Sequence, residues 1–264
     1  MQFVRCSVDG AIFTITLDRP EKRNAVHGPM AKELQQAFEK FEDDSTLRVA
    51  ILTGSGGHFC AGADLASVSD PNLRNELDPE GGGSGPMGPT RMALSEPLIA
   101  AVNGYAVAGG LELALLADMR VADEDAVFGV FCRRWGVPLI DGGTVRLPRI
   151  VGMGRALDMI LTGRAVSAQE AATMGLVNRV VPKGSALAAA RELAISILEF
   201  PQQCMLTDRA SAYAQWDLPL QQALRQEGVR GTPFGVCRRR GWCSAFRTRC
   251  REAWKFRQVN SCAD

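Results

Sequence analysis

Apolar and polar side chains alternate along residues 3–17, and the pair Asp9-Gly10 interrupts the alternation near its middle. A period of two residues is typical of a β-strand with one buried face, and Asp-Gly is a strong signal for a tight turn between two strands. The pattern therefore predicts a β-hairpin at the start of the chain.

After the hairpin, apolar residues recur at helical spacing, and short apolar runs follow. Met30, Leu34, Phe38 and Phe41 lie on one face of a helix predicted over 29–43. Continuous short apolar runs are typical of parallel strands that are buried on both faces. Such runs predict strands at 49–53 and 98–102, and further short strands are predicted at 119–122, 126–128 and 177–181.

Helices are expected between and after these strands. Ser167 and Glu170 have the spacing of a capping box for one of them, and Gly175 is its expected C-terminal stop. Strands that alternate with helices predict an α/β fold. The other helices are predicted over 142–151, 155–161 and 186–198.

The segment 103–114 (NGYAVAGGLELA) carries the strongest chemical signal. It predicts the end of a buried strand, a glycine turn and the start of an apolar helix that holds one carboxylate, Glu112. Gly109 and Gly110 allow close approach of a ligand, and the first amides of a helix have no partner within it. Such a helix start stabilises negative charge. A base that faces an anion hole suits the formation of an enolate.

Composition narrows the class of protein. The chain has 264 residues, 46% of them hydrophobic and 22% charged, and its net charge is +1. This balance is ordinary for a soluble globular protein and gives no overall attraction to nucleic acid or to an anionic membrane. The first residues have no apolar signal core, so we expect a cytoplasmic protein. Residues 98–117 contain Asn103 and Glu112, which favours a strand and a helix over a membrane span.

Cofactor chemistry has little support. The eight cysteines form no Cys-x-x-Cys pair and the chain has two histidines, so we expect neither a metal site nor disulfides. The glycines at 54–57 do not match a dinucleotide fingerprint, and the phosphate-binding lysine motif is absent. No cofactor is therefore expected.

Two segments stand apart from the predicted core. Residues 70–90 form a long loop, typical of a lid or binding loop, and we expect it to influence substrate choice. From about residue 231 the chain is rich in arginine and cysteine. This tail is either a nucleic-acid arm or an irregular extension, and we favour the extension because the rest of the chain has no basic excess.

Several segments, in order along the chain, resemble the crotonase superfamily, the enoyl-CoA hydratase/isomerase family. They are 17–25 (LDRPEKRNA), 59–65 (FCAGADL), 103–114, 142–147 (GGTVRL) and 171–177 (AATMGLV). The resemblance covers roughly residues 3–230. It implies a crotonase-like spiral of repeated strand–strand–helix units over residues 1–200 and a C-terminal helical region over 201–264. It also implies an acyl-CoA thioester as substrate and assembly as a homotrimer or a dimer of trimers.

The same resemblance implies roles for individual residues. The backbone N–H groups of Ala63 and Gly109 would hold the thioester oxygen as an oxyanion hole. The residues expected to line the CoA site are Lys22, Arg23, Ala25, Ala61, Gly62 and Asp64.

The expected proton-transfer groups depart from the two-glutamate pattern of the family's hydratases. Glu112 matches the first glutamate, but Cys132 occupies the position of the second. A thiol has an ordinary pKa near 8.5 and cannot simply replace a carboxyl group. Asp141, just before a predicted helix, is either a second catalytic carboxylate or the N-cap of that helix.

Three functions remain open at this point. Hydration of a 2-enoyl-CoA by Glu112 with help from Asp141 is the leading hypothesis. A double-bond isomerase acting on an enoyl- or dienoyl-CoA is the alternative, because moving a proton needs fewer carboxylates than adding water. A catalytically decayed CoA- or RNA-binding protein is a third hypothesis, motivated by Cys132 and the arginine-rich tail.

Overall fold

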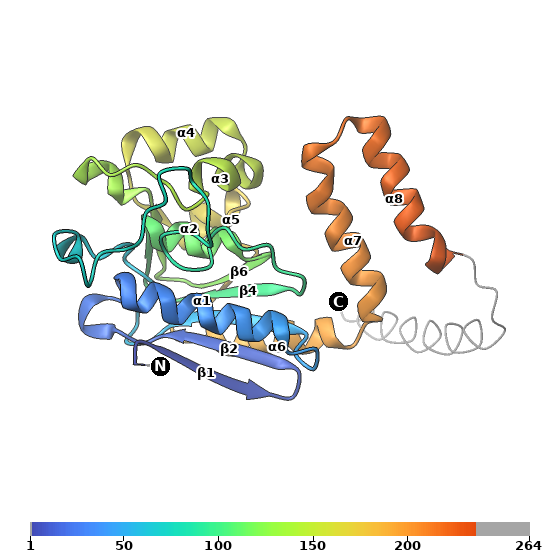
Figure 1. The fold of residues 1–264 in the computed structure, drawn as a ribbon, viewed down its shortest axis with the longest axis horizontal. Coiled ribbons are helices and arrows are strands. Elements are labelled where there is room, and N and C mark those ends of the chain that lie inside the picture. Colours follow the sequence, from blue (N-terminus) through green and yellow to red (C-terminus); the bar gives the residue numbers. More distant parts are fainter. Residues whose placement is uncertain (1, 236–264) are drawn as a thin grey trace, which may run out of the picture. The chain divides into compact units, whose positions relative to one another are not determined.

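A computed structural model gives the fold, and it describes residues 2–235, with side chains to residue 232 (Figure 1). The chain divides into two compact units, Met1–Phe200 and Pro201–Asp264. In the second unit α7 (Gln202–Ala214) and α8 (Leu220–Gly235) contact one another. The tail expected from about residue 231 lies mostly outside the described residues.

The first unit is built on a six-stranded sheet with the order β1-β2-β3-β4-β6-β9. β1 and β2 form the predicted antiparallel hairpin, and every other pair of neighbours is parallel. A second sheet has the order β5-β7-β8. The strands are β1 (Val4–Asp9), β2 (Ile12–Leu17), β3 (Val49–Gly54), β4 (Leu98–Val102), β5 (Tyr105–Val107), β6 (Met119–Asp123), β7 (Val127–Gly129), β8 (Val166–Ser167) and β9 (Arg179–Val181).

Two stretches of chain repeat one strand–strand–helix sequence. β4 joins the large sheet, β5 joins the small sheet, and α2 follows; β6, β7 and α3 repeat this order. The repeat agrees with the spiral that the resemblance implies. The helices of this unit are α1 (Gly28–Asp43), α2 (Gly109–Leu116), α3 (Gly143–Val151), α4 (Met153–Thr162), α5 (Ala168–Thr173) and α6 (Ala186–Leu198).

Alternate strand residues supply two apolar cores on opposite faces of the large sheet. Phe13 and Leu52 pack in the larger core, which includes the buried face of α1. Ile12 and Ile51 point the other way and pack with Leu193 and its neighbours on α6. In Figure 1, α1 crosses in front of the hairpin strands. Because β3 and β4 are buried on both faces, they have the continuous apolar runs expected of central parallel strands.

Three local predictions need correction. β5 is a separate strand, because the chain turns at Asn103-Gly104 before entering the small sheet. The capping box of α5 is only half formed: Ser167 accepts from the Glu170 amide, but the Glu170 carboxylate pairs with Arg164, at 2.6 Å. Asp141 is not the N-cap of α3, since that position belongs to Gly142, whose φ of 94° favours glycine.

The predicted loop over residues 70–90 contains no helix or strand. Its glycines at 81–83 are exposed, whereas residues 86–90 are buried. The end of this loop is therefore part of the packed interior and not a free surface segment.

Candidate active site

The start of α2 is shaped by close backbone approaches. Ala108 precedes the helix with φ of 53°, a value that is uncommon for a residue with a side chain. A Cβ on Gly62 would lie 3.1 Å from the Gly109 nitrogen, and one on Gly110 would lie 2.1 Å from the Cys60 carbonyl oxygen. Glycine at 62 and 110 therefore lets residues 60–63 lie directly against the first turn of α2.

This contact brings the two proposed oxyanion donors to the same place. Ala63 follows Gly62, and the space beside Gly62 is so narrow that a Cβ there would lie 3.1 Å from the Gly109 nitrogen. Within residues 2–235, neither the Ala63 nor the Gly109 amide donates a hydrogen bond. Amides that have no acceptor, one of them at the start of a helix, can bind an oxyanion.

Glu112 lies one turn into α2 and is buried, with 3% of its surface exposed. Its Oε1 accepts hydrogen bonds from the amides of Asp141 and Gly143, at 2.9 and 2.8 Å. A Cβ on Gly143 would lie 2.9 Å from Glu112 Cγ, so glycine is needed for this approach. Burial raises the pKa of Glu112 to about 7. The charge of Asp141 also raises it, whereas the hydrogen bonds from the two amides lower it. The side chain can therefore both accept and release a proton near neutral pH.

The Asp141 carboxylate is also buried, but its contacts differ. Its Oδ1 accepts a hydrogen bond from the Met87 amide at 3.0 Å and another from the Thr90 hydroxyl. Burial raises its pKa, and these hydrogen bonds oppose the rise. The sequence predicts Asp141 at the site but not its partners, which lie on the loop ending at Thr90.

Cys132 lies in a 3-10 turn (Phe131–Trp135) and is buried. Burial raises the pKa of its thiol, and the charge of Glu112 raises it further. The structure thus brings Cys132 into the electrostatic neighbourhood of Glu112 and keeps it protonated at neutral pH.

The segment expected to meet CoA forms a short parallel pairing with residues 61–64. Arg23 O accepts from the Ala61 amide at 3.0 Å, and Val26 N donates to the Gly62 carbonyl at 2.8 Å. Lys22 and Arg23 are exposed, and the Arg23 guanidinium lies 5.9 Å from the ring centroid of Tyr105. Their charges are therefore accessible to an anionic ligand.

Asp64 has a scaffold role in this pairing. Its Oδ2 lies 2.7 Å from Arg19 Nη1, which also donates to the Ala25 carbonyl at 2.9 Å. Burial favours the neutral form of Asp64, but hydrogen bonds from Arg19 and Ser67 and the charge of Arg19 outweigh it and lower the pKa.

Four residues of this region were missed as contributors by the sequence reasoning. Asn24, with φ of 56°, donates to the carbonyls of Ser55 and His58, and Arg19 binds Asp64. Met87 and Thr90 bind Asp141. Gly85-Pro86 and Gly88-Pro89, which flank Met87, were the available signal for a loop with a fixed backbone.

The described residues also bear on metal binding and membrane insertion. Residues 2–235 hold no group of three or more histidine, cysteine or acidic side chains placed to bind a metal ion. No helix in the same range is long and apolar enough to cross a bilayer.

Comparison with known proteins places this geometry in context. The family model described as enoyl-CoA hydratase/isomerase matches residues 7–232. The enoyl-CoA hydratase EchA19 of Mycobacterium tuberculosis is 41% identical over 195 residues, 71% of this chain and 71% of that protein. The mevalonyl-coenzyme A hydratase sidH of Aspergillus fumigatus is 41% identical over 186 residues, 70% of this chain and 68% of that protein. A crystal structure of enoyl-CoA hydratase from Mycobacterium tuberculosis H37Rv has a TM-score of 0.86 at 33% identity and covers 94% of this chain and 97% of its own.

Proposed function

Because the chain belongs to the enoyl-CoA hydratase/isomerase family, we propose that it is a hydratase that adds water to the double bond of a 2-enoyl-CoA. The observation that carries this proposal is Glu112. It is a buried carboxylate with a pKa of about 7, one helical turn from the Gly109 amide.

The thioester oxygen binds the Ala63 and Gly109 amides, which stabilise the negative charge that develops on it. Loss of one such donor typically costs about 10²–10³ in rate. The narrow space between Gly62 and the Gly109 nitrogen supports this assignment, because Ala63 follows Gly62 directly in the chain.

Glu112 acts first as base and then as acid. Its carboxylate takes a proton from water as the water oxygen bonds to C3, and the electron pair of the C2=C3 bond moves onto the thioester oxygen. The enolate then returns its electrons and C2 takes the proton from Glu112. One carboxyl group with a pKa near neutrality can perform both transfers, which fits the protonated Cys132 at the second position.

A double-bond isomerase is the second candidate. It is favoured by the hydrogen bonds that already engage the Asp141 carboxylate, since an isomerase needs fewer carboxylates than a hydratase. With Asp141 bound to Met87 and Thr90, the described site presents one carboxylate for proton transfer. Glu112 would remove a proton from C2 of a 3-enoyl-CoA and return it to C4, with no water consumed.

Product analysis in D₂O separates the candidates. The enzyme is incubated with 2-enoyl-, 3-enoyl- and dienoyl-CoA esters, and products are followed by mass spectrometry and NMR. Addition of water to a 2-enoyl-CoA that is lost in Glu112→Gln supports the hydratase. Deuterium incorporation or double-bond movement without added water would instead assign the isomerase. Retained CoA binding with no turnover of any ester would favour a binding protein.

We propose further features that the resemblance to this family supports. Residues 1–200 form the acyl-CoA-binding core, with Lys22, Arg23, Ala25, Ala61, Gly62 and Asp64 in the segments that line the CoA site and the thioester as sole ligand. The protein is a cytoplasmic homotrimer or dimer of trimers, with residues 201–264 as its C-terminal helical region. Sedimentation of the full chain and fractionation of cells test these two points.

A further inference from the structure

Asp141 connects two segments that are far apart in sequence. Its side chain accepts from Met87 N and from the Thr90 hydroxyl, across more than fifty residues. Arg146 adds to this connection, since it donates to the Thr90 carbonyl at 2.7 Å and to the Asp141 carbonyl at 3.1 Å. The buried end of the loop is therefore bound through backbone groups of Met87 and Thr90 and through the Thr90 side chain.

The backbone of the same residue holds Glu112. The Asp141 amide donates to Glu112 Oε1 at 2.9 Å, beside the bond from Gly143. A displacement of Asp141 would therefore move a hydrogen-bond donor of Glu112 and the Met87–Thr90 segment together.

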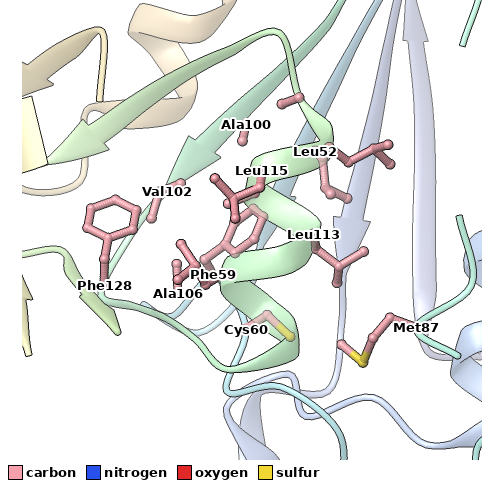
Figure 2. Close-up of a cluster of buried hydrophobic side chains, with 14 of the residues drawn as sticks. Leu52, Phe59, Cys60, Met87, Ala100, Val102, Ala106, Leu113, Leu115 and Phe128 are labelled. Atoms are coloured by element: carbon pink, nitrogen blue, oxygen red, sulfur yellow. The ribbon is translucent and has the colours of Figure 1, made fainter. Parts of the chain in front are cut away.

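Met87 extends this connection to the oxyanion hole. A Cβ on Gly109 would lie 2.9 Å from Met87 Sδ, so the buried thioether packs directly on the first residue of α2. Figure 2 shows the Met87 side chain beside the early turns of α2, together with Cys60 and Leu113. One residue of the loop thus contacts Gly109 through its side chain and Asp141 through its amide.

We infer that Asp141 is a positioning residue that fixes Met87 and Glu112 relative to the oxyanion hole. Its carboxylate is used as an acceptor for the loop, while its amide orients the proton-transfer group. The inference rests on the proposed function for its kinetic consequences, because Glu112 and Gly109 are the groups that Asp141 positions. Met87 packs on Gly109 at a distance that its hydrogen bond to Asp141 sets.

Two substitutions of Asp141 test this role. Asp141→Asn keeps the backbone amide and an Oδ1 that can accept from Met87, so kcat falls less than about tenfold. Asp141→Ala removes the acceptor, and KM rises more than kcat falls because the loop is released. A loss in kcat of about 10²–10⁴ in Asp141→Asn, typical of a lost general acid or base, would overturn the inference.

Thr90 supplies a matched pair. Thr90→Val removes the hydroxyl at nearly constant volume, whereas Thr90→Ser keeps it. We expect an increase in KM for valine and native-like kinetics for serine. Equal effects in the two variants would contradict a link through the Asp141–Thr90 hydrogen bond.

A measurement without substrate separates this inference from the proposed reaction. In the ligand-free protein, ¹³C NMR of the Glu112 carboxyl should give a lower pKa in Asp141→Asn, since a negative charge that raises it is removed. Hydrogen exchange at the Met87 amide should accelerate in Asp141→Ala. If the exchange accelerates in a protein that turns over no ester, the positioning role stands and the proposed reaction fails. Unchanged exchange at the Met87 amide in Asp141→Ala would contradict the positioning role whatever the activity, while the Glu112 pKa reports only the charge at residue 141.

Discussion

Two buried carboxylates of this protein lie in different electrostatic surroundings, and Glu112 is enclosed more deeply than Asp64. Asp64 is 8% exposed and has the Arg19 guanidinium 2.7 Å away, whereas Glu112 is 3% exposed and is hydrogen-bonded by two backbone amides. The paired carboxylate has a lowered pKa, and burial raises that of Glu112 to about 7. A buried carboxylate with a hydrogen-bonded cation is a fixed charge, whereas at Glu112 burial outweighs the two amides and leaves a group that can exchange protons near neutral pH.

Removal of the titrating group should give the largest effect. Glu112→Gln keeps an oxygen that can accept from Asp141 and Gly143 but cannot transfer a proton. We expect kcat to fall by about 10³-fold, within the range for a lost general acid or base, with little change in the affinity for a CoA ester. Steady-state kinetics and calorimetric binding measure the two quantities. Retained turnover would refute the role of Glu112.

Removal of the paired carboxylate should act on stability instead. Asp64→Asn leaves the Arg19 guanidinium, whose side chain is 12% exposed, without its buried partner, and the exposed Glu21 carboxylate remains 3.7 Å away. Breaking a buried pair on one side costs about 3 kcal/mol of unfolding free energy. Because the folded pKa of Asp64 is lowered, its contribution is present above the unfolded pKa and lost as pH falls. Urea unfolding at pH 8 and pH 4 should therefore show a smaller difference at pH 4. Full native stability at pH 8 would contradict the pairing.

The pH dependence of stability that Glu112 contributes has the opposite sign. Its pKa rises from an ordinary value of 4.5 to about 7 on folding, so the native state binds more protons in this interval and wild-type stability falls as pH rises through it. Relative to Glu112→Gln, the wild type should lose up to about 3 kcal/mol between pH 4.5 and pH 7. Unfolding of both proteins across this range measures the difference. Parallel pH curves would show that burial does not perturb Glu112.

The smallest effect on kinetics is expected at Lys22 and Arg23, which are exposed beside the segment that pairs with residues 61–64. The double variant Lys22→Ala, Arg23→Ala removes two charges that are accessible to CoA phosphates. KM should rise about threefold to tenfold, the scale of exposed ion pairs, with kcat unchanged and a smaller effect at high salt. Lys40→Ala, at an exposed lysine in the last turn of α1, is the control. An equal change in the control would argue against phosphate contact.

Much of the fold could be predicted from the sequence, because the signals that specify it act between neighbours in the chain. The apolar runs, the Asp9-Gly10 turn and the glycines before Glu112 act through neighbours in the chain, so the hairpin, the central strands and α2 were predicted near their observed places. The short strand β5 was missed because a turn at Asn103-Gly104 separates two apolar runs that read as one.

The surroundings of the two carboxylates could not be predicted in the same way. Arg19 and Asp64 lie 45 residues apart, and Met87 and Asp141 lie 54 residues apart, so neither pairing leaves a periodic signal. From its place before a helix, Asp141 could be a catalytic carboxylate, an N-cap or both. The structure excludes the N-cap role, because Gly142 occupies that position. Tertiary contacts decide which acidic residue is fixed and which can titrate.

Direct titration of the two carboxyl groups tests this distinction most simply. ¹³C NMR of the ligand-free protein from pH 3 to pH 9, assigned with Glu112→Gln and Asp64→Asn, follows each group separately. The account predicts a midpoint of about 7 for Glu112 and a midpoint below the ordinary value for Asp64. An ordinary midpoint near 4.5 for Glu112 would contradict it, because Glu112 would then be ionised at neutral pH and poorly suited to return a proton to the enolate.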